Sequence, residues 1–133
     1  MTDPALEPYG DPITGPFWEA AARRVLLIQR CEDCEACQFY PRPICLACES
    51  RHLAWIEASG TATIYSLTTV HLRTAPEFEP PYVTALIDLD EGVRMLTIII
   101  GDNPKIGDRV RLAWRERDGL PPLPIWTTEW RKQ

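Results

Sequence analysis

The sequence predicts a mainly β protein in which a small cysteine-rich module precedes a barrel of short strands. All five cysteines fall within residues 31–50, and a module of that size needs a metal ion or disulfides to fold. After the cysteines, β-branched and apolar runs alternate with turn signals about every 8–12 residues, as in small antiparallel barrels and sandwiches. The 13 prolines among 133 residues also favour loops and short strands over long helices.

The N-terminal part of the chain is expected to form a tail, one helix and one strand. Residues 1–15 are rich in Pro and Gly and show no periodicity, which predicts an extended tail. Pro16 can occupy the first turn of a helix, and the alanine-rich stretch 17–24 is compatible with that helix. The apolar run 25–30 then predicts a strand that ends at Cys31.

Further strands are predicted at regular spacing after the cysteines. Residues 73–81 hold three prolines and cannot form a central strand. Residues 120–130, with three prolines and two tryptophans, are expected to be an irregular tail. About five strands over some 75 residues match the size of an OB-type barrel. The predicted strands are residues 53–57, 61–72, 82–88, 93–100 and 109–115.

The spacing of the cysteines predicts a metal site. Cys31 and Cys34 form one C-x-x-C pair, and Cys45 and Cys48 form another. Two such turns facing each other supply four thiolates, which suit one tetrahedral zinc ion with no open position for water. The predicted Zn²⁺ is therefore structural. Iron in a rubredoxin-type site is the rival metal, and a catalytic dithiol is a further alternative that lacks the βαβ context it requires.

Two features complicate the assignment of ligands. Cys34 and Cys37 form an overlapping C-x-x-C pair, and only one of the two pairs can face Cys45 and Cys48. We favour Cys31 with Cys34 because the predicted strand ends directly at Cys31, and we expect Cys37 to be a free neighbouring thiol. Zinc turns often place glycine after the second cysteine, where φ is positive. Glu35 and Glu49 stand there instead, a departure that we expect to weaken the site.

No catalytic residues are predicted. The sequence contains no G-x-S-x-G, P-loop or G-x-G-x-x-G motif, and its two histidines, His52 and His71, are expected to be surface or packed residues. The net charge of −5 argues against nonspecific nucleic-acid binding. The chain shows no secretory signal, and its apolar runs are too short to span a bilayer. We therefore expect a cytoplasmic protein with no membrane partner.

Motifs spread over most of the chain carry a resemblance to a known family. Each is weak alone, but their order and spacing are specific. The chain resembles the acyl-CoA-associated zinc-ribbon plus OB-fold proteins, long catalogued as a domain of unknown function. The matching residues are Pro16-Phe17-Trp18-Glu19, Gln29-Arg30-Cys31-x-x-Cys34, Pro41-Arg42-Pro43-x-Cys45-x-x-Cys48, Gly60-x-x-x-Ile64-Tyr65-Ser66, Pro81-Tyr82-Val83, Ile87-Asp88-Leu89-x-Glu91-Gly92 and Leu120-Pro121.

The resemblance implies both the fold and the role of the chain. The fold class it supports is mainly β, with an N-terminal helix and a rubredoxin-like zinc ribbon followed by a five-stranded OB-fold barrel. The expected domains are a tail at 1–15, the helix plus zinc ribbon at 16–55, the barrel at 56–128 and a tail at 129–133. The resemblance also assigns Cys31 and Cys34, and not Cys37, to the zinc.

In function, the resemblance implies a non-catalytic accessory subunit. Family members stand beside thiolases, thiolase-like aldolases, hydroxymethylglutaryl-CoA synthase-type enzymes, acyltransferases or enoyl-CoA hydratases, where they bridge subunits or complete an acyl-CoA channel. The partner would supply the catalytic residues. The alternatives are a single-stranded nucleic-acid-binding module, since zinc ribbons and OB folds both serve that use, and a small redox protein with iron at the cysteines.

Five residues are predicted contacts for CoA, acyl-CoA or a partner subunit. Arg73, Phe78 and Tyr82 lie on or next to the proline-rich segment 73–81, which could equally be a rigid surface loop. Trp126 and Trp130 lie near the C-terminus, and tryptophan is enriched at interface hot spots. The competing interpretation of Trp126 is that it closes the barrel.

Overall fold

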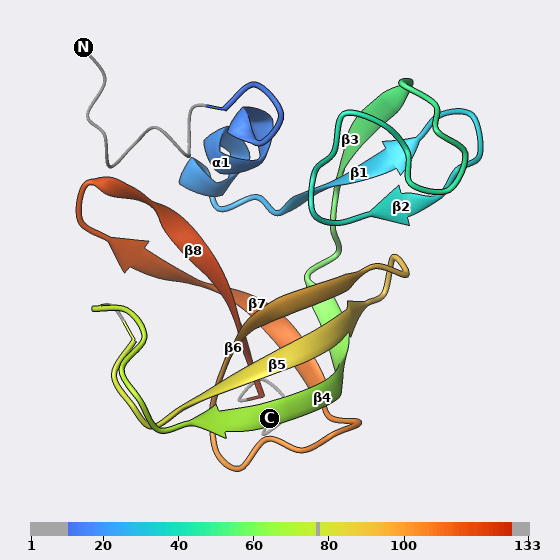
Figure 1. Ribbon diagram of the computed structural model, residues 1–133. Helices are drawn as coiled ribbons and strands as arrows, with labels where there is room; N and C mark the ends of the chain where they lie inside the picture. Colours follow the sequence, from blue (N-terminus) through green and yellow to red (C-terminus); the bar gives the residue numbers. More distant parts are fainter. Residues whose placement is uncertain (1–10, 77, 129–133) are drawn as a thin grey trace. The chain divides into compact units, whose positions relative to one another are not determined.

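The computed structural model describes residues 11–76 and 78–128, and Figure 1 shows the course of the chain through them. Within these residues one short helix precedes eight strands, so the chain is mainly β, as predicted. The elements are α1 (Gly15–Ala22), β1 (Leu27–Cys31), β2 (Cys37–Gln38), β3 (Leu53–Glu57), β4 (Thr61–Val70), β5 (Tyr82–Leu89), β6 (Arg94–Ile100), β7 (Arg109–Arg117) and β8 (Leu120–Thr127).

Helix α1 forms where the sequence predicts it, with a proline in its first turn. Its buried residues Phe17, Ala20 and Ala21 have the i, i+3, i+4 spacing of one helix face. The amide of Val25 donates to the carbonyl of Ala20 at 3.0 Å and closes the C-terminal end. In the described part of the chain, no helix has the length and apolar character needed to cross a membrane.

Strand β1 is the centre of a three-stranded antiparallel sheet in the order β2-β1-β3. Ile28 pairs with Ile56, and Cys31 at the end of β1 pairs with Leu53 at the start of β3. The sheet therefore delivers the first cysteine directly from a strand end, as the sequence predicts. The predicted domain boundary between residues 55 and 56 falls inside β3, which lies entirely within this sheet.

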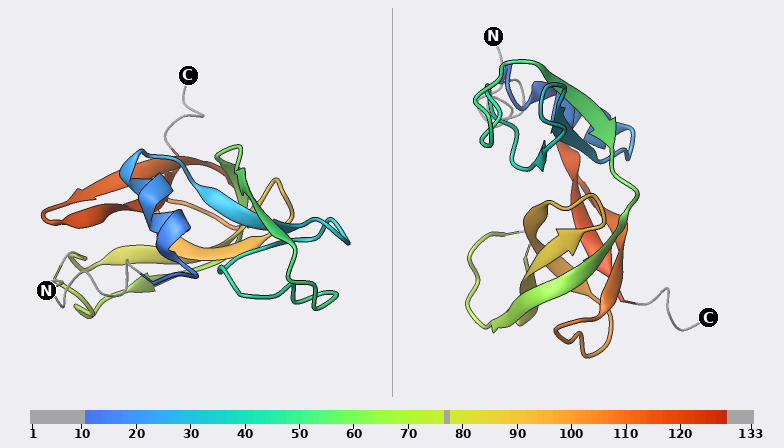
Figure 2. Two further views of the ribbon diagram at one scale, coloured as in Figure 1. Left: turned by 90° about the horizontal axis from the view of Figure 1, so that it is seen from above. Right: turned by 90° about the vertical axis from the view of Figure 1, so that its right-hand side faces the viewer.

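Strands β4 to β8 form a closed barrel in the order β4-β5-β6-β8-β7, and β4 pairs with β7 to complete the ring. Figure 2 shows these strands wrapping around one interior. Alternate residues point inward, as in β6, where Met95, Thr97 and Ile99 are buried. The apolar interior is made by Ala62, Ile64, Ala85, Ile87, Leu89, Val93, Met95, Ile99, Val110, Ile125 and Trp126.

The fifth barrel strand is β8, and the prediction of an irregular tail over residues 120–130 is wrong for 120–127. The three prolines misled the prediction because proline lacks an amide hydrogen for a sheet. In the structure, β8 pairs with β6 in parallel only at Trp126 and Thr127. All three prolines precede those two residues, so this pairing requires no amide from proline.

The described chain forms two compact units that are discontinuous in sequence. One unit combines residues up to Ser59 with Trp114–Leu123, and the other combines Gly60–Ala113 with residues from Pro124 onward. Strands β7 and β8 therefore contribute residues to both units, whereas the sequence predicts two continuous domains. The predicted tail residues 129–133 and most of the predicted tail 1–15 lie outside the described residues.

The turn between β7 and β8 packs within the first unit. Glu116 accepts hydrogen bonds from the guanidinium of Arg24, just after α1. The guanidinium of Arg117 lies over the ring of Trp18 in α1, 5.8 Å from its centroid. Residues distant in sequence thus complete the unit that carries the cysteines.

Candidate metal centre

Two turns of the same backbone design carry the cysteines. In the first turn, the amide of Glu35 donates to the carbonyl of Cys31 at 2.9 Å. In the second turn, the amide of Glu49 donates to the carbonyl of Cys45 at 2.8 Å. Each turn thereby brings its two cysteines to one side, as the C-x-x-C spacing predicts.

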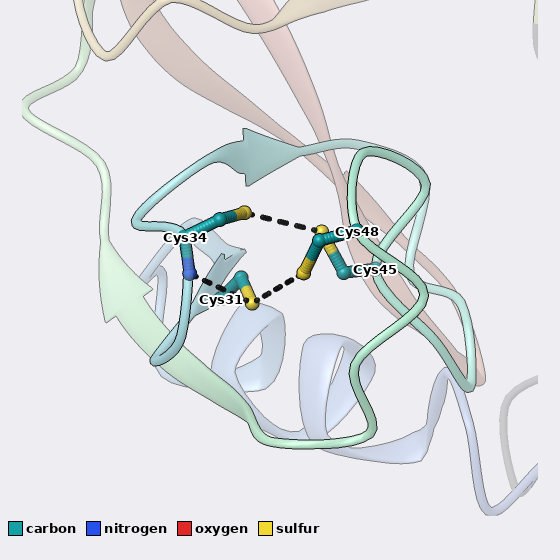
Figure 3. Close-up of side chains that lie close together, drawn as sticks. All are labelled: Cys31, Cys34, Cys45 and Cys48. Atoms are coloured by element: carbon teal, nitrogen blue, oxygen red, sulfur yellow. Dashed lines mark hydrogen bonds between the residues drawn. The ribbon is translucent and has the colours of Figure 1, made fainter.

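The four predicted ligands converge in space. The sulfur atoms of Cys31, Cys34, Cys45 and Cys48 all lie within 4.8 Å of one another, and Figure 3 shows them pointing toward a common centre. The Cys31–Cys48 and Cys34–Cys45 Sγ distances are both 3.6 Å. A tetrahedral zinc ion with Zn–S bonds of about 2.3 Å separates its sulfurs by roughly 3.8 Å, so the donor set fits this ion.

Each turn contributes one buried and one exposed sulfur-bearing residue. Cys31 and Cys45 are buried, whereas Cys34 and Cys48 are exposed. The amide of Cys34 donates to Cys31 Sγ at 3.5 Å, and the amide of Ala47 donates to Cys45 Sγ at 3.4 Å. Such amide–sulfur hydrogen bonds favour the thiolate form, which is the form that binds metal.

The four thiols do not ionise alike. The amide of Cys34 is the main reason that the pKa of Cys31 is lowered to about 6. At Cys48 the amide of Ser50 acts in the same direction, but burial of the sulfur and the neighbouring thiols outweigh it and raise the pKa of Cys48 to about 12. Four thiolates this close repel one another, and a dication that binds all four removes that penalty.

Glu35 and Glu49 adopt the backbone conformation that usually belongs to glycine. Their φ angles are 67° and 66°, in the left-handed region that side chains with a Cβ disfavour. Glu35 pairs with the guanidinium of Arg30 on β1 at 3.0 Å. The sequence therefore locates both strained positions correctly, because each directly follows a C-x-x-C pair.

Cys37 lies apart from the other four cysteines. It belongs to β2, where it pairs with Arg30 of β1, and its side chain is half-buried. Among the residues that the structure describes, only the cluster of Cys31, Cys34, Cys45 and Cys48 brings three or more potential ligands close enough to share a metal ion.

Sequence reasoning missed the two glutamines that hold the loop between the cysteine pairs. The Gln29 amide accepts from the backbone amide of Arg42 at 2.8 Å and donates to the carbonyl of Arg42 at 2.9 Å. Gln38 donates to Gln29 at 2.8 Å and accepts from the amide of Leu46 at 3.0 Å. Both glutamines are buried. Gln29 belongs to the family motif that includes Cys31, but nothing in the sequence indicates the bonds that either glutamine makes.

A second polar group links the two cysteine turns at the surface. Asp33 lies between Cys31 and Cys34, and its carboxylate accepts a hydrogen bond from the hydroxyl of Ser50. The same oxygen lies 3.0 Å from Nδ1 of His52. The Ser50 hydroxyl oxygen in turn accepts the backbone amide of His52 at 3.0 Å. His52, expected as a surface or packed residue, is thus a surface residue with a defined partner.

The predicted contact residues of the loop after β4 are engaged with one another. The guanidinium of Arg73 pairs with Glu79 at 2.7 Å. The hydroxyls of Tyr82 and Thr74 are 2.6 Å apart, and the rings of Phe78 and Tyr82 lie 5.5 Å apart. These contacts connect the described residues of the loop, and Arg73 is committed to an ion pair with Glu79.

The two predicted tryptophan contacts differ in outcome. Trp126, in β8, has no exposed surface, which favours the interpretation that it closes the barrel. Trp130 lies outside the described residues. His71, next to β4, is exposed.

Four converging cysteines in two matching turns, together with a closed five-stranded barrel, define a zinc ribbon combined with an OB fold. The family model for the rubredoxin-like zinc ribbon domain of ChsH2 matches residues 18–54. The model for the C-terminal OB-fold domain of ChsH2 matches residues 55–115. These matches confirm the predicted fold class.

The chain belongs to the DUF35 family. A DUF35 domain-containing scaffold protein of Methanocaldococcus jannaschii is 33% identical over 104 residues, which cover 74% of this chain and 74% of that protein. The family resemblance drawn from the sequence motifs is thereby confirmed.

Two further relatives carry names that refer to enzymes. A probable enoyl-CoA hydratase alpha subunit of Thermomonospora curvata is 42% identical over 114 residues, which cover 83% of this chain. This chain spans only 36% of the length of that subunit. A solved structure described as an Ltp2-ChsH2(DUF35) aldolase matches with a TM-score of 0.80 and 38% identity, covering 88% of this chain and 94% of that chain.

Proposed function

We propose that Cys31, Cys34, Cys45 and Cys48 bind one structural Zn²⁺ per chain. The support is the set of four sulfurs within 4.8 Å, with two pairs spaced as a tetrahedral zinc site requires. Four cysteines complete the coordination of the ion, so zinc bound here has no open position for water or substrate. The zinc would hold the two turns together and contribute directly to folding.

The zinc proposal is tested by two cysteine variants. Cys45→Ser removes a buried ligand, so we expect loss of zinc, measured by inductively coupled plasma mass spectrometry, and a poorly folded or insoluble chain. Cys37→Ser is the matched control, since that thiol lies outside the cluster, and it should keep one zinc per chain. If Cys37→Ser lost the metal while Cys31→Ser retained it, the proposed ligand set would be wrong.

We propose further that the chain is a non-catalytic accessory subunit of an enzyme that processes acyl-CoA. The observation that carries this proposal is the match, over 88% of this chain, to the DUF35 chain of a structure described as an aldolase. Relatives named as a hydratase alpha subunit and as a scaffold protein support the same role. A thiolase, thiolase-like aldolase, acyltransferase or hydratase would then supply the catalytic residues.

The proposed partner contact is the loop after β4, with Arg73, Phe78 and Tyr82. The Arg73–Glu79 ion pair and the Phe78–Tyr82 ring contact restrict these side chains before binding, which lowers the entropy cost of association. Leu72 beside it is 78% exposed, an apolar side chain available to a partner. Binding of CoA and binding of the partner subunit to the Leu72→Ser variant are measured separately. Weaker binding of the partner alone indicates a protein contact at this loop, and weaker binding of CoA alone indicates a CoA contact.

The subunit proposal is tested by reconstitution. The chain alone should show no turnover of an acyl-CoA, whereas the partner captured with it should form a stable complex at micromolar concentration. Turnover by the isolated chain would overturn the non-catalytic role. Salt-dependent binding of single-stranded RNA or DNA, without any enzyme partner, would favour the nucleic-acid alternative.

A further inference from the structure

Three polar side chains form a bridge between the two cysteine turns, outside the shell of sulfur atoms. The Asp33 bridge, as we call it, consists of Asp33, Ser50 and His52. One carboxylate oxygen of Asp33 accepts a hydrogen bond from the Ser50 hydroxyl. The same oxygen lies 3.0 Å from Nδ1 of His52. The backbone amide of His52 completes the ring by donating to the Ser50 hydroxyl oxygen at 3.0 Å.

The bridge lies at the exposed side of the cysteine cluster. Asp33 directly precedes Cys34, and Ser50 follows Cys48 by two residues. Cys34 and Cys48 are the two exposed cysteines of the cluster, so a chelator in solution would meet their sulfurs first.

The bridge also extends the pairing of β1 with β3. That pairing ends at Cys31 and Leu53, and the amide of Glu32 then donates to the carbonyl of His52 at 2.8 Å. The Asp33 bridge adds a side-chain connection one residue further into the first turn. Moving the two turns apart therefore requires the hydrogen bonds to Asp33 to break.

We propose that the Asp33 bridge controls how fast zinc leaves the four-cysteine site, by keeping the exposed sides of the two turns together. The proposal rests on the zinc site put forward above and assigns Asp33, Ser50 and His52 as positioning residues for it. Zinc leaves when exposed thiolates detach and the turns separate, and the bridge opposes that separation. Partners hydrogen-bonded directly to metal ligands commonly change metal affinity by about 10–100-fold, and the side chains of the Asp33 bridge act one step further out, through the turns that carry the ligands.

Because the Asp33 bridge is exposed, its effect on zinc release can be distinguished from an effect on the packing of the chain. The side chains of Asp33 and His52 are 55% and 73% exposed. Exposed polar pairs contribute little to global stability, so removing the bridge should leave unfolding of the chain nearly unchanged. A change in zinc release without a change in unfolding would therefore identify a positioning role.

The decisive experiment measures the rate at which the zinc-loaded full chain transfers zinc to 4-(2-pyridylazo)resorcinol. Asp33→Ala should release zinc about tenfold faster than the unmodified chain, at the lower end of the range for such groups. Glu32→Ala is the matched control, because it removes a neighbouring carboxylate of the same turn that takes no part in the bridge. The free energies of unfolding in urea should differ among the three proteins by no more than the roughly 1.4 kcal/mol that a tenfold change in zinc affinity carries through linkage.

A second pair of variants tests the Asp33 bridge even if Asp33→Ala misfolds. Ser50→Ala should accelerate release, whereas Ser50→Thr, which keeps the hydroxyl, should restore the slow rate. In cobalt-substituted protein, the visible spectrum of these variants should remain that of four thiolates, because no sulfur ligand has changed. Equal release rates for Asp33→Ala, Glu32→Ala and the unmodified chain would overturn the proposal.

The zinc content of the unmodified chain separates the two proposals. A chain that binds no zinc would defeat the zinc site, and the bridge proposal with it. A chain with one zinc whose release is insensitive to Asp33 and Ser50 would defeat the bridge proposal alone.

Discussion

At Glu35 and Glu49 the backbone has the conformation of glycine while the side chain is that of glutamate. The positive φ angles of 67° and 66° belong to the turns that bring two cysteines each to one side. Glu35 has the ion pair with Arg30 as partial compensation. The two turns therefore retain strain that a single substitution can relieve.

Glu49→Gly should stabilise the zinc-loaded chain. Glycine adopts positive φ without the steric penalty of about 1–2 kcal/mol that other residues carry, although it also gains freedom in the unfolded chain. We expect a net gain of about 0.5–1 kcal/mol in the free energy of unfolding, measured with urea. Glu49→Ala is the control, because it removes the carboxylate but keeps Cβ; an equal gain there would contradict backbone strain as the cause.

Individual residues were predicted best where metal binding requires a fixed spacing between cysteines. The C-x-x-C pairs locate the four converging sulfurs and both strained positions. The bonds that Gln29 and Gln38 make to the intervening loop were not predicted, because a buried glutamine has no characteristic spacing. Trp126 was ambiguous for a related reason, since tryptophan is common both in cores and at interfaces.

At the scale of elements, closure of the barrel depends on the segment between β6 and β7 and on the end of β8. Gly101 follows β6 with φ of 114°, and a Cβ placed on it would collide with the hydroxyl of Thr128. The amide of Thr128 donates to the carbonyl of Ile100 at 3.2 Å. Only glycine meets both requirements, the positive φ and the close approach.

Gly101→Ala should therefore destabilise the barrel by at least about 2 kcal/mol, from steric overlap added to backbone strain. Thermal unfolding followed by circular dichroism measures the effect. Gly92→Ala is the matched control, since Gly92 also has positive φ, at 90°, but has nothing within 4 Å of the added Cβ. Equal losses for the two variants would show that contact with Thr128 contributes nothing.

The turn between β5 and β6 is tied to β7 by an ion pair with a pH dependence. The guanidinium of Arg109 donates to both carboxylate oxygens of Asp90, at 2.7 and 2.9 Å. These bonds, with that from Thr61, lower the pKa of Asp90 to about 2. Because the folded pKa lies below the unfolded value of about 3.9, the stabilisation is present above pH 4 and is lost as pH falls toward 2.

Asp90→Asn should remove that part of the acid dependence. We expect the unmodified chain to lose more stability than Asp90→Asn between about pH 4 and pH 2, where Asp90 is protonated in the unfolded chain before it is protonated in the folded one. Urea unfolding at a series of pH values measures the difference. Parallel stability curves for the two proteins over this interval would rule out Asp90 as a contributor.

Element boundaries were predictable where strands are β-branched and bounded by turns. Strand β3 was located at residues 53–57 without error, and β5 was missed by one residue at its end. Strand β8 was missed because its prolines resemble those of an irregular segment. Its pairing with β6 joins segments that are distant in sequence, and no local pattern reports such pairing.

At the scale of the whole molecule, the chain combines a ribbon with four cysteines and a closed barrel, and it belongs to a family with members named as scaffold proteins and enzyme subunits. The residues that contact one another in the first unit come from both ends of the described sequence. Within this unit, the guanidinium of Arg117, beside the turn between β7 and β8, lies over the ring of Trp18 in α1.

Native mass spectrometry of the full chain, captured from the lysate of its own cells, tests whether the chain is a zinc-binding subunit of an enzyme. One spectrum reports both the metal and the partner. We expect a complex of this chain with an acyl-CoA enzyme subunit, with one zinc ion retained for each copy of the chain. A chain that carries no zinc and no enzyme subunit would contradict it.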